Sequence, residues 1–132
     1  MPAHLATIEI VVADMARALD FYRHLGFDLP DGAAGEPHVE VALDGGLKVA
    51  FDTEDTIRSF DPSWVRPEKG HGLALAFACD DPADVDATFG LLLTVGGAAH
   101  LEPWDAFWGM RYAVVHDPDG NPVDLFASLP AS

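Results

Sequence analysis

The chain has 132 residues, which suits one compact domain, and its 22 acidic and 7 basic side chains give a formal net charge of -15. Because Lys and Arg contacts to phosphate supply most of the affinity for nucleic acid, this charge argues against a nucleic-acid partner and favours a neutral or cationic ligand, although surface solvation would also account for it. The single cysteine, Cys79, forms no intrachain disulfide and no apolar run reaches the roughly 18 residues of a membrane span, so we expect a cytoplasmic protein without a membrane partner.

The first segment predicts a strand followed by a capped helix. Residues 5–12 alternate in polarity and are rich in Ile, Val and Thr, as in a half-buried strand. Asp14 is a good N-cap, and Gly26 stands where a helix-ending glycine belongs. Between these two residues the apolar side chains follow helical spacing: Met15, Ala18, Leu19, Tyr22 and Leu25.

Three further strands are expected in the first half. A short strand over Phe27–Leu29 precedes a loose stretch bounded by prolines. His38–Leu43 and Leu47–Asp52 then form a hairpin through Asp44-Gly45-Gly46, whose residue types favour a tight turn. Residues of about 4–52 therefore predict a β-α-β-β-β module.

The second half repeats this order after a connector. Residues 53–71 have no clean hydrophobic period and form the connector. Leu73–Cys79 predicts a strand, and Asp81 is the N-cap of a helix with Pro82 at its first position. The helix ends at Gly96-Gly97, and its apolar face contains Val85, Phe89, Leu92 and Leu93.

Three strands complete the second module, at about 72–128. Ala99–Trp104 is the first, and Met110–Val115 and Val123–Ala127 form a hairpin. The hairpin turn, residues 117–122, reads Asp-Pro-Asp-Gly-Asn-Pro and is dense in turn-forming residues. The chain is thus an α+β protein with an internal repeat of roughly 65–70 residues. A single ferredoxin-like sheet is the alternative, but it leaves the repeat unexplained.

Three segments resemble the vicinal oxygen chelate superfamily, which includes glyoxalase I, extradiol dioxygenases, fosfomycin-modifying enzymes and bleomycin-resistance proteins. They are Val12-Ala13-Asp14 with Ala18–Gly26, Asp80-Asp81 with the helix up to Gly96-Gly97, and Asp117–Asn121 leading to Val123-Asp124-Leu125. The resemblance covers nearly the whole chain. It implies one domain, residues 1–132, in which two βαβββ modules form a cup-shaped, curled mixed sheet with helices outside and a ligand inside, usually in a homodimer.

Metal-dependent members of this superfamily place one ligand on each of four strands. Counted from the helix-capping aspartates, the resemblance puts these positions on Thr7, at or next to Ala50, on Ala74 and on Asp124. One carboxylate does not hold a divalent metal, because catalytic sites use about three protein ligands. We therefore expect no metal and no other cofactor. A rearranged site would have to draw on the six histidines: His4, His24, His38, His71, His100 and His116.

Strand periodicity turns several side chains toward the expected cup. On the first strand these are Thr7, Glu9 and Val11, and Glu9 would either receive a ligand cation, shuttle a proton or remain a hydrated edge residue. On the first strand of the second module, three small side chains face inward and leave room: Ala74, Ala76 and Ala78. The residues expected against the helix on that strand are Leu73, Leu75, Phe77 and Cys79.

Aromatic residues gather before the last hairpin. Trp104 and Trp108 could stack on a flat ligand and attract a cation, or pack against the core or a dimer partner. Arg111 could orient a ligand carbonyl, or pair with Asp105 or Asp117. The candidate ligand-binding residues are Asp124, Trp108, Trp104, Glu9, Arg111, Phe126, Thr7 and Phe51.

These observations favour a metal-free binding protein of the bleomycin-resistance type. It would sequester a cationic or planar aromatic compound, such as an antibiotic, in an acidic, tryptophan-lined cup shared across a homodimer. Two alternatives stay open. One is an enzyme, either a lyase, isomerase or dioxygenase with unusual metal ligands or a metal-free acid–base catalyst that uses Glu9 or Asp124. The other is a stress or regulatory module without small-molecule chemistry.

Overall fold

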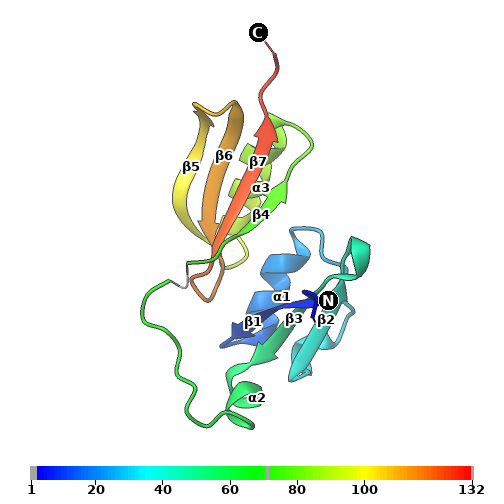
Figure 1. The fold of residues 1–132 in the computed structure, drawn as a ribbon. Coiled ribbons are helices and arrows are strands. Elements are labelled where there is room, and N and C mark those ends of the chain that lie inside the picture. Colours follow the sequence, from blue (N-terminus) through cyan, green and yellow to red (C-terminus); the bar gives the residue numbers. More distant parts are fainter. Residues whose placement is uncertain (1–2, 71, 132) are drawn as a thin grey trace.

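The computed structural model describes residues 3–70 and 72–131 and folds them into two β-sheets with helices (Figure 1). Sheet A has the strand order β1-β3-β2, and sheet B has the order β4-β7-β6-β5. The predicted α+β class is confirmed. No ladder joins β1 to β4 within the described residues, so the strands form two sheets and not one continuous sheet. In the same residues no helix has the length and apolar character needed to cross a membrane.

Sheet A and its helix come from the first half of the chain. The elements are β1 (Thr7–Val12), α1 (Met15–Arg23), β2 (His38–Ala42) and β3 (Lys48–Thr53). β1 pairs in parallel with β3, and β2 pairs antiparallel with β3. As predicted, the Asp14 side chain caps α1 by accepting a hydrogen bond from the Arg17 amide at 3.2 Å.

The strand predicted over Phe27–Leu29 is wrong, because this segment closes helix α1 instead. Gly26 takes a left-handed φ of 96°, and the Phe27 amide then donates to the Tyr22 carbonyl at 3.3 Å. The Phe27 ring stacks on the Tyr22 ring with their centroids 5.7 Å apart. Phe27 is therefore a core aromatic residue at a helix end, and sheet A has three strands.

The connector contains a helix that the sequence analysis missed, α2 (Glu54–Arg58). Thr53 caps it by accepting from the Thr56 amide at 3.2 Å, and acidic residues occupy its first turn. The cap and the charges are visible in the sequence, but five residues are too few to show a hydrophobic period.

Sheet B and its helix come from the second half. The elements are β4 (Leu75–Ala78), α3 (Pro82–Leu93), β5 (Ala98–Ala106), β6 (Met110–His116) and β7 (Pro122–Ser128). β4 pairs in parallel with β7, while β5 and β6 form the antiparallel part. The predicted Asp81 cap is present, and its side chain accepts from the Asp84 amide at 3.0 Å.

Two leucines predicted to be buried are exposed. Leu93 lies one residue beyond the buried stripe that Val85, Phe89 and Leu92 form, so the helix turns it toward solvent. Leu73 is 78% exposed, because β4 begins only at Leu75. Leu75, Phe77 and Cys79 do pack against the core, as expected.

One hydrophobic core runs through both halves, because α1 packs against residues of the second half. The Tyr22 ring lies 6.5 Å from the Phe77 ring of β4. Phe21 comes so close to Gly97 that a Cβ there would lie 2.9 Å from the Phe21 ring and 2.7 Å from the Leu92 carbonyl oxygen. Gly97 is therefore required for close contact between the halves, in addition to its expected role in ending α3.

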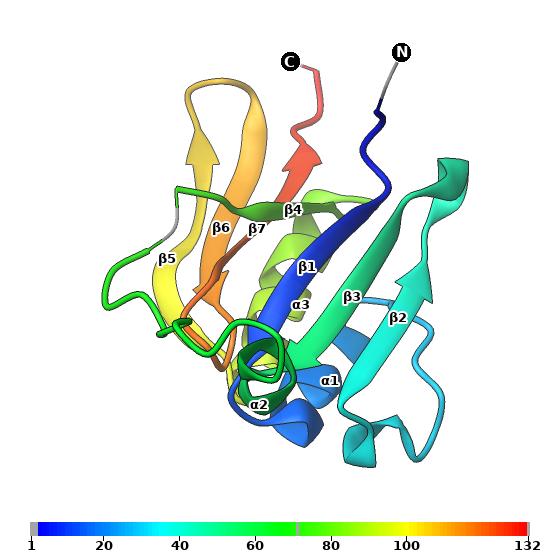
Figure 2. The same cartoon turned by 60° about the horizontal axis from the view of Figure 1, so that its bottom comes forward.

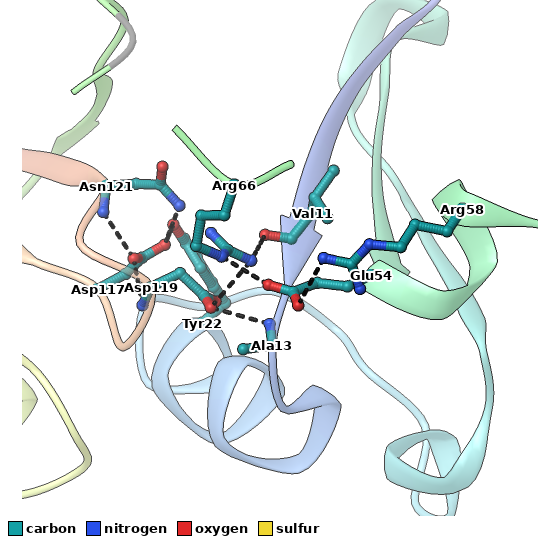
Figure 3. Close-up of polar contacts among 9 residues, drawn as sticks. All are labelled: Val11, Ala13, Tyr22, Glu54, Arg58, Arg66, Asp117, Asp119 and Asn121. Carbon is teal, nitrogen blue, oxygen red and sulfur yellow. Dashed lines mark hydrogen bonds and ion pairs between the residues drawn. The ribbon is translucent and has the colours of Figure 1, made fainter. Parts of the chain in front are cut away.

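The buried carboxylate of Asp117 joins the two halves through hydrogen bonds (Figure 3). Its Oδ2 accepts from the Tyr22 hydroxyl at 2.7 Å and from the Asn121 side chain at 2.9 Å, and its Oδ1 accepts from the backbone amides of Asp119 and Asn121. Burial, followed by the charge of Asp117, raises the pKa of Tyr22 far above its usual range. The turn at residues 117–122 thus connects the two halves of the chain. We call Asp117 and its hydrogen-bond partners, Tyr22, Asp119 and Asn121, the joint.

Helices α1 and α3 pack on one side of the two sheets, and on the other side the short helix α2 contacts only the ends of β1 and β3. In Figure 2 α1 and α3 lie behind the strands. The alternate residues on the other face of sheet B are more exposed, among them Ala76, Trp104 and Tyr112. We call the side of each sheet away from α1 and α3 its open face.

We predict that Tyr22→Phe lowers the free energy of unfolding by about 1–3 kcal/mol, because it removes one of four donors to a buried carboxylate. Urea denaturation followed by circular dichroism measures the change. Tyr112→Phe is the matched control, since it also removes a hydroxyl bonded to an aspartate but at a partly exposed position. An equal loss in both variants would show that burial of the joint has no special weight.

Candidate functional site

Four aromatic side chains cluster on the open face of sheet B around Tyr112, whose hydroxyl contacts the carboxylate of Asp124. The cross-strand register places Trp104 beside Tyr112, and Tyr112 beside Phe126. The Tyr112 ring centroid lies 5.6 Å from Trp104 and 5.3 Å from Trp108. We call the set of Trp104, Trp108, Tyr112, Asp124 and Phe126 the aromatic face. Trp108 is 47% exposed, so part of its ring is open to a ligand.

The carboxylate of Asp124 lies within this face and is held by Tyr112. The Tyr112 hydroxyl donates to Asp124 Oδ2, and within the described residues no donor contacts the other carboxylate oxygen. Partial burial and then the hydrogen bond to Asp124 raise the pKa of Tyr112 to about 12. Tyr112 therefore keeps its proton at neutral pH and Asp124 keeps one oxygen free to accept.

The structure thus brings together four of the predicted ligand-binding residues, Trp104, Trp108, Asp124 and Phe126. It adds Tyr112, which the sequence analysis did not select. Two features of the sequence could have identified Tyr112. It is next to Arg111 on β6 and so faces the opposite side of the sheet, and the short turn after β5 pairs it with Trp104 on the neighbouring strand.

Arg111 lies on the other side of sheet B, where helix α3 packs. Its Nε and Nη2 donate to Asp86 of α3 at 2.9 and 3.2 Å, and its Nη1 donates to Asp105 at 3.1 Å. The expected pairing with Asp105 is therefore present, whereas Asp117 is bound in the joint. These hydrogen bonds raise the pKa of Arg111. The structure does not place Arg111 with the aromatic face.

The three remaining candidates belong to sheet A. Phe51 is fully buried in the core, with its ring 5.2 Å from Tyr22, so a ligand cannot reach it. Thr7 and Glu9 lie on the open face of β1, where Glu9 pairs in register with Ala50. Glu9 is exposed and lines a cavity at the edge of β1.

This cavity, of about 460 Å³, lies between the unpaired edges of β1 and β4. Its walls are mostly apolar, and the connector supplies part of them. The lining residues are Leu5, Ile8, Glu9, Ile10, Val11, Tyr22, Trp64, Arg66, Pro67, Leu73, Ala74, Leu75, Asn121 and Pro122.

The donors at the expected ligand positions do not fit a chelated metal. Thr7, Ala50 and Ala74 provide no imidazole or carboxylate, and Ala50 is buried. In the part of the chain that the structure describes, no three His, Cys, Asp or Glu side chains converge on a point that could hold a metal ion. We therefore assign no metal chemistry to these residues.

The described histidines do not converge on one point. His100 stacks on His116 with the ring centroids 4.6 Å apart, and His24 bonds the Asp20 carbonyl at the end of α1. His4 is an exposed residue that precedes β1. His71 lies outside the described residues.

His38 lies between two carboxylates on the open face of sheet A. Its Nδ1 lies 2.5 Å from Asp52 Oδ1, and its Nε2 lies 2.9 Å from Glu40 Oε2. Lys48 also pairs with Glu40, at 3.3 Å. The hydrogen bond to Asp52, followed by the one to Glu40, raises the pKa of His38. This group links the edge strand β2 to β3.

Comparison with known proteins supports the fold and the family. Residues 3–125 match the model of the Glyoxalase/Bleomycin resistance protein/Dioxygenase superfamily. No curated protein matches the chain.

Solved structures show the same fold at low sequence identity. A glyoxalase-related enzyme from Fulvimarina pelagi has a TM-score of 0.79 at 17% identity, over 95% of this chain and 88% of that one. A hypothetical protein from S. aureus has a TM-score of 0.77 at 19% identity, over 96% and 94%. TioX from Micromonospora sp. ML1 has a TM-score of 0.61 at 24% identity, over 96% and 100%.

We predict that Tyr112 ionises at about pH 12 in the folded protein, two units above an ordinary tyrosine. In Tyr22→Phe, Tyr112 is the one tyrosine left, so phenolate absorbance reports it directly. Adding Asp124→Asn should lower the midpoint. Because the pKa of Tyr112 is higher in the folded chain than in the unfolded chain, the protonated hydroxyl adds to the free energy of unfolding. This contribution is complete below about pH 10 and is lost by about pH 12. Phenolate formation near pH 10 in chains that circular dichroism shows to be folded would contradict this.

We also predict that the His38 imidazole stays protonated at pH values above 6.5, the ordinary pKa of a histidine. The contribution of protonated His38 to the free energy of unfolding is complete below pH 6.5 and declines as the pH rises through the raised pKa. NMR titration of the ring measures this value. Asp52→Asn should lower it, whereas Asp44→Asn, which removes an exposed charge at the β2–β3 turn, should leave it unchanged.

Proposed function

The chain belongs to the Glyoxalase/Bleomycin resistance protein/Dioxygenase superfamily, and we propose that it is a binding protein of the bleomycin-resistance type that holds a planar aromatic cation on its aromatic face. The observation that carries this proposal is the arrangement around Tyr112. Its ring packs against Trp104 and Trp108, and its hydroxyl donates to the Asp124 carboxylate, whose other oxygen accepts no hydrogen bond among the described residues, on a face of sheet B that α3 does not cover. An antibiotic with a flat ring system and an amine has the matching chemistry.

Both parts of the ligand find a favourable contact on this face. A flat ring stacks on the exposed part of Trp108, and a positive charge beside an indole gains about 0.5–2 kcal/mol. An ammonium group that donates to the free oxygen of Asp124 forms a charge-assisted hydrogen bond. The net charge of -15 also attracts cations over a longer range. These contacts need no metal.

The homodimer remains part of the proposal. Phe107, at the turn between β5 and β6, is 97% exposed, and its ring lies 5.0 Å from Trp108. Exposed rings of this size favour coverage by a second chain. A second copy at this turn would enclose the end of the aromatic face. We place the protein in the cytoplasm on the basis of its single cysteine.

Catalysis by Asp124 or Glu9 is the second candidate function. Tyr112, which donates to Asp124, supports a positioned carboxylate that could act as a base. We rank binding first because the half-exposed Trp108 ring and the free oxygen of Asp124 together match a planar cation. Turnover that disappears in Asp124→Asn would move catalysis to first place.

We predict that proflavine, a planar aromatic cation, quenches tryptophan fluorescence in a saturable titration. Asp124→Asn should weaken its binding by about tenfold to a hundredfold, because it removes the charged acceptor. Trp108→Ala should weaken it by about 2- to 30-fold through the lost cation–π contact. Calorimetry on the same samples gives the stoichiometry.

Two controls separate specific binding from general attraction to an acidic protein. Asp44→Asn removes the same unit of charge at an exposed turn outside the aromatic face and should leave the affinity unchanged. The anionic dye 1-anilinonaphthalene-8-sulfonate should not compete for the face. Equal weakening in Asp124→Asn and Asp44→Asn would sink the proposal.

A further inference from the structure

The cavity between β1 and β4 is separate from the aromatic face in its residues and its chemistry. None of the five residues of the aromatic face lines it. It lies where the open edges of the two sheets approach each other, with Tyr22 of α1 among its lining residues. Its volume of about 460 Å³ is in the range of pockets that hold drug-sized ligands, roughly 300–1,000 Å³.

Large apolar side chains form the cavity and remain exposed around it. Leu5 is 74% exposed and Leu73 is 78% exposed, although both line the cavity. Ile8, Ile10 and Leu75 line it as well. Leaving two leucines in water costs free energy that a bound apolar molecule would recover.

The polar groups of the cavity are largely occupied by the protein itself. The Tyr22 hydroxyl and the Asn121 side-chain amide both donate to Asp117. The guanidinium of Arg66 is taken up by Glu54 and by the Val11 carbonyl. Glu9 has no ion pair or side-chain hydrogen bond among the described residues. An anionic ligand would therefore meet a free carboxylate and no free cation.

We propose that this cavity is a second small-molecule site, for an uncharged and largely apolar molecule. The lining favours an apolar body, and Glu9 together with the net charge of -15 disfavours an anion. The unpaired edges of β1 and β4 offer backbone groups for a single hydrogen-bonding atom on the ligand. This site does not depend on the function proposed for the aromatic face.

Arg66 holds the connector beside the cavity through hydrogen bonds and ion pairs (Figure 3). Its Nε donates to Glu54 Oε2 at 2.6 Å, and its Nη2 donates to the Val11 carbonyl at 3.2 Å and lies 3.5 Å from Asp119 Oδ1. One side chain thus ties the connector to β1 and to the β6–β7 turn. Because Trp64 and Pro67 of the connector also line the cavity, release of Arg66 would open its wall.

Two probes with the same ring system test the ligand class. N-phenyl-1-naphthylamine is uncharged, and 1-anilinonaphthalene-8-sulfonate adds one sulfonate. The uncharged probe should bind saturably with one site per chain, with fluorescence enhancement as the readout. The sulfonate should bind about tenfold more weakly, because its charge meets Glu9. Equal affinity for both probes would overturn the assignment of ligand class.

Substitution inside the cavity tests the location. Ala74→Phe, at an exposed lining position, should fill the space and weaken binding of the uncharged probe by about tenfold. Ala42→Phe, on an exposed position of β2 outside the cavity, is the matched control and should have no effect. Circular dichroism verifies that both variants fold. Unchanged binding in Ala74→Phe would overturn the proposal.

A pair of arginine variants tests the fastening role. Arg58 and Arg66 both pair with Glu54 and both lie over the Trp64 ring, but among the described residues only Arg66 bonds β1 and Asp119. In stopped-flow mixing, Arg66→Gln should speed association of the uncharged probe by about fivefold, and Arg58→Gln should not. Equal rates in the two variants would show that Arg66 does not control entry.

The two proposed sites can fail separately. Asp124→Asn should weaken proflavine binding and leave the uncharged probe unaffected, and Ala74→Phe should do the opposite. If the uncharged probe does not bind and Leu73→Ser turns a dimer into a monomer in light scattering, then a second copy of the chain covers the cavity. That result would overturn the small-molecule site and leave the aromatic face untouched.

Discussion

The buried carboxylate of Asp117 holds the two halves of this protein in one arrangement. A charge without water is costly unless it is fully bonded, and here a hydroxyl from α1, a side-chain amide and two backbone amides satisfy it. The Tyr22 hydroxyl that takes part lies 95 residues away in the sequence. Because this bond orients α1 against the last hairpin, it also sets where the edges of β1 and β4 meet, and hence the cavity between them.

Much of the fold could be predicted from local chemistry. Capping by Asp14 and Asp81 and alternation along the strands are short-range signals, and the structure follows them. Local chemistry does not predict the elements whose conformation depends on tertiary contacts. Phe27 has the residue type of a strand, but stacking on Tyr22 holds it at a helix end. The helix α2 was missed because its capping signals stand without a hydrophobic period.

In the candidate site, too, strand alternation predicts some residues correctly, whereas contacts between elements decide the others. Alternation along β7 puts Asp124 and Phe126 on one side of the strand, and the structure agrees. The sequence could not show that Asp86 of α3 takes Arg111, because that ion pair depends on how helix and sheet pack. Phe51 lies on the helix side of β3, opposite in parity to Ala50 and Asp52, so strand parity alone excludes it from the open face. The cavity was beyond prediction, since it arises between two modules.

The contact between Phe21 and Gly97 has a consequence for how the chain folds as it is synthesised. Phe21 leaves the ribosome early, yet part of its cover is the backbone at Gly97 and the neighbouring Val115. Until those residues emerge, the Phe21 ring lacks this part of its cover, although Tyr22 can already pack on Phe27 and Phe51. The first half alone leaves the Phe21 part of the core incomplete, so we expect the two halves to unfold together. The matching order of elements in the two halves therefore does not make either of them an independent domain.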